Sequence, residues 1–173
     1  MSARYAACSD VAASVLWKAD RMSEVRTVVV AEGVAPDGEP WTLHYAPKGD
    51  RGYPHHLALF VNGAERESGS GFDVPGTTEI GFGGGLTPGE GNYYLYGLTT
   101  SRIRTVRAES HDDARHSEAS TAAFPVEATV GGDALRIFVL VRPAIEDVTA
   151  LVGLDQAGRE AQRIPLLGPP ERS

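Results

Sequence analysis

Apolar and polar residues alternate along most of the chain after residue 25. A period of two puts every second side chain on the same face of a strand, so this pattern predicts β-strands that bury one face and expose the other. We therefore expect a chain that folds mainly as β-sheet. Four segments carry the pattern most clearly, with these apolar positions on one face: Trp41, Leu43 and Tyr45; Leu57, Leu59 and Val61; Phe124, Val126, Ala128 and Val130; Val148, Ala150, Val152 and Leu154.

One segment, residues 135–141, is apolar on both faces apart from Arg136. Strands with this composition are usually covered on each side. The segment is therefore predicted to be a central strand that packs on both faces or lies against a helix, with Phe138 and Val139 in the core.

Turn-forming residues separate the strand patterns. Pro36-Asp37-Gly38, Asn62-Gly63, residues 131–133 and residues 155–158 each stand between two alternating segments. Such sequences favour hairpins, so the sheets are predicted to be mainly antiparallel. About nine or ten short strands at this spacing indicate an all-β fold, a two-sheet antiparallel β-sandwich with an immunoglobulin-like or jelly-roll-like topology.

The arginine-rich segment 101–107 interrupts the alternation. Its apolar positions step from Ile103 to Val106, an odd spacing that one bulge residue near Thr105 would restore. With that bulge, Arg102, Arg104 and Arg107 all face solvent.

The beginning of the chain has a different pattern. Ser9 or Asp10 is a suitable cap for a short N-terminal helix that ends near Arg21, and Met22 directly precedes the first strong strand pattern. We therefore expect an N-terminal extension over residues 1–21, a β-sandwich domain over residues 22–167 and a C-terminal tail over residues 168–173.

Composition and charge limit the classes of function. A chain of 173 residues with 42% hydrophobic content is long enough for one core and one domain. A net charge of −7 without a basic segment argues against a nucleic-acid partner. Cys8 is the single cysteine, which excludes an intramolecular disulfide and a thiolate metal cage. No apolar run approaches the roughly 18 residues of a membrane span, and no signal peptide is recognisable, so we expect a cytoplasmic protein.

Several motifs between residues 25 and 165 resemble uncharacterised actinobacterial β-sandwich domains. That resemblance implies a fold and no activity. Members of the group carry cysteines at the positions that Ala58 and Ser70 occupy here, so this chain lacks that cysteine pair. A disulfide between such cysteines would be typical of a protein outside the cytoplasm, and its absence weakens an inference of export. The motifs that carry the resemblance are residues 41–43, 57–61, 68–75, 96–98, 102–107 and 150–159.

Residues 109–118 hold the strongest candidates for metal binding. His111, Asp113 and His116 are ligand types that zinc uses, and further carboxylates surround them. The segment lies in a polar stretch between two strand patterns, without a third imidazole or an HExxH spacing. We favour a solvated loop without bound metal.

Other candidates also have a structural interpretation. His55 and His56 are adjacent on a strand and point to opposite faces; His55 is interpreted as a rim or buried histidine with one hydrogen bond, and His56 as a surface residue. The glycine-rich segment 81–85 lacks the helix that a phosphate loop requires, which favours a flexible loop. The five residues Trp41, Tyr45, Tyr93, Tyr94 and Tyr96 could form a binding platform, but the alternation favours a packed face.

No complete catalytic constellation emerges from these residues. The hypothesis favoured by the sequence is a non-catalytic binding or protein-interaction module without a metal or organic cofactor. Its predicted contact surface combines the loops at residues 81–91 and 111–118. The alternative is a small hydrolase or metal-dependent enzyme that uses the 109–118 loop.

Overall fold

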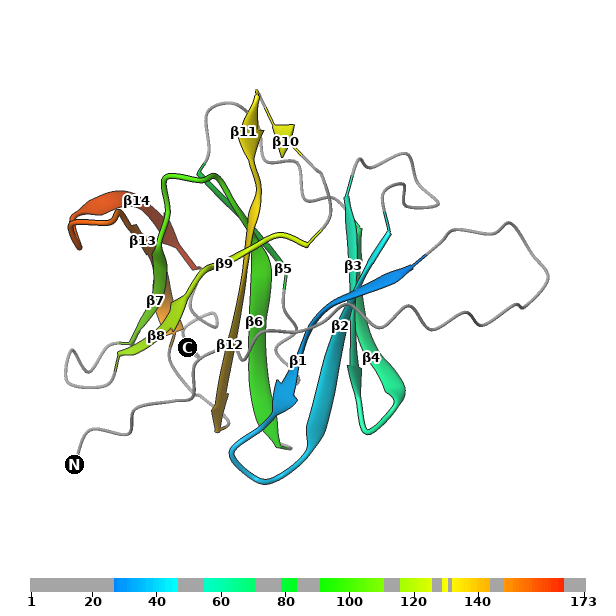
Figure 1. Ribbon diagram of the computed structural model, residues 1–173. Helices are drawn as coiled ribbons and strands as arrows, with labels where there is room; N and C mark the ends of the chain where they lie inside the picture. The colour runs from blue at the N-terminus through cyan, green and yellow to red at the C-terminus, as the bar shows by residue number, and fades with distance from the viewer. Residues whose placement is uncertain are drawn as a thin grey trace, which may run out of the picture.

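The computed structural model in Figure 1 describes residues 27–46, 55–70, 79–83, 91–110, 116–125, 129–130, 132–143 and 148–166. All regular secondary structure in these ranges is β-strand, and all strand pairs are antiparallel, which confirms the prediction of an all-β chain. No helix long and apolar enough to cross a membrane occurs in the same ranges. The predicted N-terminal helix, the extension 1–21 and the tail 168–173 lie outside the described residues.

The described strands form three four-stranded sheets and one two-stranded ribbon. The first sheet is a meander of consecutive strands: β1 (Val28–Val34), β2 (Pro40–Ala46), β3 (His56–Val61) and β4 (Ala64–Ser70). The middle sheet has the order β5 (Ile80–Gly83), β6 (Asn92–Thr99), β12 (Arg136–Pro143), β9 (Ala122–Ala123). The third sheet has the order β14 (Glu160–Pro165), β13 (Val148–Leu154), β7 (Thr105–Ser110), β8 (Ser117–Ser120), and the ribbon pairs β10 (Thr129–Val130) with β11 (Asp133–Ala134).

The middle sheet is buried on both faces and lies between the other two in Figure 1. One core joins it to the first sheet and includes Tyr94 and Tyr96; the other joins it to the third sheet and includes Tyr93 and Leu95. β12 contributes to both cores, as predicted for residues 135–141; Phe138 is buried as predicted, whereas Val139 is half-buried at the edge of the other core. The described sheets therefore enclose two cores, whereas a two-sheet arrangement would enclose one, because β6 and β12 carry apolar side chains on each face.

Tight turns connect consecutive strands where the sequence predicts them. Between β3 and β4, Asn62 and Gly63 have φ values of 53° and 76°. Positive φ at both central residues of a two-residue hairpin matches the twist of the flanking strands, and asparagine and glycine adopt it readily. The predicted hairpin at this turn is confirmed.

Two local predictions are wrong. Phe124 does not begin a strand: β9 ends at Ala123, and Pro125, which follows Phe124, has no N–H to donate to a sheet. Residues 126–128 of the predicted strand lie outside the described residues. No bulge occurs near Thr105, because β7 begins at that residue and Ile103 is buried in the preceding connection. Arg102 and Arg104 are exposed, as predicted.

Thr121 is the point at which the chain passes from the third sheet to the middle sheet, between β8 and β9 (Figure 1). Its N–H donates to the carbonyl oxygen of Arg104 at 2.9 Å, and its Oγ1 donates to the carbonyl oxygen of Ile103 at 2.8 Å. The Nε of Arg136 donates to Thr121 Oγ1 at 2.6 Å, and its Nη2 donates to the Thr121 carbonyl. These bonds hold the two sheets together at a corner.

Candidate functional site

The proposed metal ligands are only partly within the described structure. His111 and Asp113 lie outside the described residues, and His116 is exposed just before β8. Among the described residues, no group of three or more His, Cys, Asp and Glu side chains could hold a metal ion. This finding does not test the 111–116 segment, so the absence of a metal stays a prediction.

The two predicted contact loops are shorter than expected. Glu109 and Ser110 end β7, and Ser117 and Glu118 begin β8, so the ends of the 109–118 segment belong to a sheet. Residues 81–83 belong to β5 in the same way, while residues 84–90 lie outside the described structure. These ends are strands because polar residues can occupy the outward positions of a sheet, so polarity alone did not identify a loop.

His55 is a buried histidine, as predicted. Its side chain forms a hydrogen bond between Nδ1 and the Tyr45 hydroxyl at 3.0 Å, and the Tyr45 ring packs edge-on against Phe124 with centroids 4.8 Å apart. Burial raises the pKa of Tyr45, so the phenol stays protonated. His56 is half-buried, whereas we expected a surface residue. A structural role explains the His55–Tyr45 pair.

The aromatic platform is excluded by burial. All five aromatic residues considered for it belong to a hydrophobic core, which confirms the packed-face interpretation: Trp41, Tyr45, Tyr93, Tyr94 and Tyr96.

The outer face of the third sheet holds the most extensive polar network of the described residues. In β7, Val106 and Ala108 point into the core, so the alternation places Arg107 and Glu109 on the opposite, outer face. The strand register then sets Glu118 of β8 opposite Arg107. We call the five charged residues of this surface the charged face: Arg107, Glu109, Glu118, Glu160 and Arg163.

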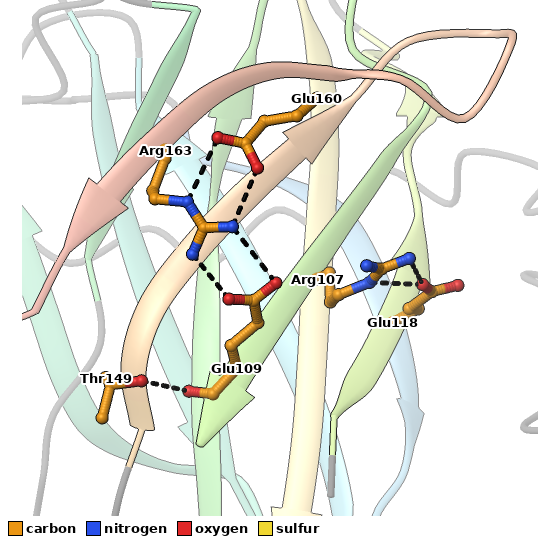
Figure 2. A network of polar contacts seen from close by, with 6 residues as sticks. All are labelled: Arg107, Glu109, Glu118, Thr149, Glu160 and Arg163. Atoms are coloured by element: carbon orange, nitrogen blue, oxygen red, sulfur yellow. Dashed lines mark hydrogen bonds and ion pairs between the residues drawn. The ribbon is translucent and has the colours of Figure 1, made fainter. Parts of the chain in front are cut away.

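Arg163 lies at the centre of the network, between Glu109 and Glu160 (Figure 2). Its Nη1 donates to Glu109 Oε2 at 2.6 Å, its Nε donates to Glu160 Oε1 at 3.1 Å, and its Nη2 donates to Glu160 Oε2 at 2.8 Å. The hydrogen bonds to Glu160 and then to Glu109 raise the pKa of Arg163. The bond from Arg163 lowers the pKa of Glu160. The two groups therefore keep their opposite charges over the physiological range.

A second ion pair lies next to the first on the same face. Arg107 donates from Nε to Glu118 Oε1 at 2.7 Å, and its Nη2 is 2.6 Å from the same oxygen (Figure 2). Thr149 donates from Oγ1 to the backbone carbonyl of Glu109 at 3.3 Å. The two groups of polar contacts together span all four strands of the sheet.

A buried apolar residue of β13, Val152, lies between the charged side chains. Val152 pairs in register with Arg107 on one side and with Arg163 on the other, and it is only 1% exposed. Arginine side chains commonly lay their aliphatic stems over apolar neighbours and keep the guanidinium in water. The charged face therefore lies above a well-packed strand.

The chemistry of the charged face suits recognition better than proton transfer. Glu160 accepts two hydrogen bonds from the Arg163 guanidinium, which favours its ionised form. Glu109 and Glu118 also accept hydrogen bonds from guanidiniums. The sequence alone did not indicate these residues as a site. The alternating Arg107 and Glu109 within a strand pattern was the available signal, but the partners Glu118 and Arg163 depend on strand order and register.

Comparison with models of protein families, with curated proteins and with solved structures found no match. The resemblance to uncharacterised actinobacterial β-sandwich domains stays a prediction.

Proposed function

We propose that the protein is a non-catalytic binding module whose charged face contacts a protein partner. The observation that carries this proposal is the position of Arg163, whose guanidinium is held by two carboxylates while 45% of its side chain stays exposed. An exposed charged group in a fixed geometry is suited to recognition.

The energetics support a role other than stabilising the fold. Exposed ion pairs contribute only about 0–1 kcal/mol each to stability. The sheet beneath is already stabilised by the hydrophobic core that includes Val106, Ala108 and Leu151. The same ion pairs reduce the side-chain freedom that Arg163 and Arg107 would lose on binding, and this lowers the entropic cost of association.

The distribution of charge indicates the kind of partner. Both signs alternate across the charged face, so a protein surface with interspersed charges is the complementary ligand. The net charge of −7 disfavours the phosphate backbone of a nucleic acid. We further propose a sandwich-type frame, with immunoglobulin-like or jelly-roll-like topology, in a cytoplasmic protein. Each of the two cores lies between two antiparallel sheets, as the core of a sandwich does, and this supports a layered sandwich in which both cores share the middle sheet.

The test compares capture from a native lysate by three immobilised chains: wild type, Arg163→Ala and Arg66→Ala. Arg66 is an exposed residue of β4 in the first sheet, so its substitution removes the same charge from a different surface. We expect a protein that wild type and Arg66→Ala retain and that Arg163→Ala loses. Circular dichroism controls for folding. Identical sets of retained proteins for the three folded chains would contradict the proposal.

A further inference from the structure

Two arginine side chains near the Thr121 corner have no counter-ion among the described residues. Arg136 occupies the same face of β12 as Phe138 and Leu140, which point toward the core of the third sheet. Its Nε and Nη2 bind Thr121, whose N–H in turn binds the carbonyl of Arg104. In the described part of the chain, no carboxylate forms an ion pair with Arg136 or with Arg104.

The environment of Arg136 makes the missing counter-ion significant. The residue is half-buried, and burial, followed by the charge of nearby Arg104, lowers the pKa of its guanidinium. A partly desolvated charge that faces a like charge is unfavourable unless an opposite charge compensates it. Exposed Arg104 offers a second guanidinium from the solvent side.

Beside Arg136 lies a buried hydroxyl for which the described part of the chain offers no hydrogen-bond partner. Thr99 pairs directly with Arg136 across β6 and β12, which places their Cβ atoms about 4.5–5.5 Å apart on one face of the sheet. The Thr99 side chain is fully buried, and its Oγ1 has no hydrogen-bond partner among the described residues. Buried hydroxyls are usually satisfied, so this atom is a second indication of an absent polar ligand.

We propose that Arg104, Arg136 and the Thr99 hydroxyl form a binding site for a phosphate group, either inorganic phosphate or a phosphomonoester. A phosphate carries close to two negative charges near neutral pH, which compensates two guanidiniums, whereas a carboxylate carries one. Guanidinium donors match the geometry of phosphate oxygens. The site does not include any residue of the charged face, so each proposal can fail without affecting the other.

Isothermal titration calorimetry of the full chain with inorganic phosphate tests the site. We expect saturable binding of one phosphate per chain. Arg104→Gln should weaken it about tenfold or more and Thr99→Val about threefold or more, because a charged and a neutral donor are lost. Arg102→Gln is the matched control, since exposed Arg102 is already paired with Glu79 at 3.3 Å. Thermal unfolding verifies that each variant is folded.

The outcomes separate a specific site from general attraction of anions. The proposal would be overturned if folded wild type showed no saturable phosphate binding, or if Arg102→Gln weakened phosphate binding as much as Arg104→Gln. It would also be overturned if acetate bound as tightly as phosphate. Parallel titrations with glycerol phosphate distinguish the two possible ligands, inorganic phosphate and a phosphomonoester. Tighter binding of glycerol phosphate would assign a phosphomonoester, and tighter binding of inorganic phosphate would assign the free ion.

Discussion

Phe138 is the largest side chain that β12 contributes to the core between the middle and third sheets, and it is 1% exposed. Truncation to alanine removes its buried ring and leaves a cavity that the surrounding strands fill only in part. We expect Phe138→Ala to lower the free energy of unfolding by about 3–5 kcal/mol, measured by denaturant titration. Val139→Ala, at a half-buried position, should cause a smaller loss. A loss below about 1 kcal/mol for Phe138→Ala would show that the side chain is not enclosed.

His44 should make stability depend on pH. Its ring lies against that of Phe60, with centroids 4.3 Å apart and the ring planes tilted by 35°. Burial lowers the pKa of His44, and the charge of Glu65 opposes this shift. The unfolded chain therefore takes up a proton near the ordinary histidine pKa, whereas the folded chain does so at lower pH. Stability should fall as pH decreases from about 7 to about 5, because the unfolded state binds more protons in that window.

The histidine contribution can be isolated by substitution. His44→Gln should reduce the slope of unfolding free energy against pH between about pH 5 and pH 7, measured by urea titrations at each pH. An unchanged slope in the folded variant would show that protonation of His44 is not linked to unfolding.

At the residue scale, the sequence predicts burial better than pairing. Alternation was sufficient to predict a buried face for Trp41, and to put Tyr94 and Tyr96 on the opposite face of their strand from Tyr93, because the two faces of a strand are fixed by its period. The Arg163–Glu109 pair joins residues 54 positions apart in the chain. Such pairs follow from the order and register of the strands, which no local pattern specifies.

Gly97 allows β5 to pair closely with β6. A Cβ at this position would collide with the backbone oxygen of Gly81, would lie 2.8 Å from Phe82 Cα and would lie 2.9 Å from the Phe138 ring. The backbone contacts cannot be relieved by a side-chain rotation. We expect Gly97→Ala to destabilise the fold by about 1–3 kcal/mol or more, measured by denaturant titration.

Gly153 provides the comparison for this prediction. A Cβ there would meet only the side-chain ends of Ile80 and Ile103, at 2.8 and 2.9 Å, and these can move. Gly153→Ala should therefore destabilise the fold less than Gly97→Ala. The reverse order would indicate that β5 adjusts its position relative to β6.

At the element scale, hairpins are predictable because a few turn residues determine them locally. The number of sheets is not predictable from local sequence, because the sheet to which a strand belongs depends on pairing between distant segments. β8 and β9 show the difference: a single residue, Thr121, separates them, yet they belong to the third and the middle sheets. The sequence signal of a strand apolar on both faces, residues 135–141, was the one indication of a middle sheet.

At the scale of the whole molecule, the proposed function depends on a rigid sheet that presents charged groups. From the sequence we predicted that two loops form the contact surface, since binding residues often lie on loops. The structure instead brings Arg107, Glu118 and Arg163 together on the outer face of four strands. Only the assembled sheet defines this surface, and so its residues could not be grouped from the sequence.

The most direct test of the account is the affinity of the purified chain for the protein that capture identifies. The dissociation constant should be measured for wild type, Arg163→Ala and Arg66→Ala. We expect about tenfold or weaker binding for Arg163→Ala, because one charge-assisted contact is lost, and no change for Arg66→Ala. Equal dissociation constants for the three folded chains would contradict the assignment of the charged face as the binding surface.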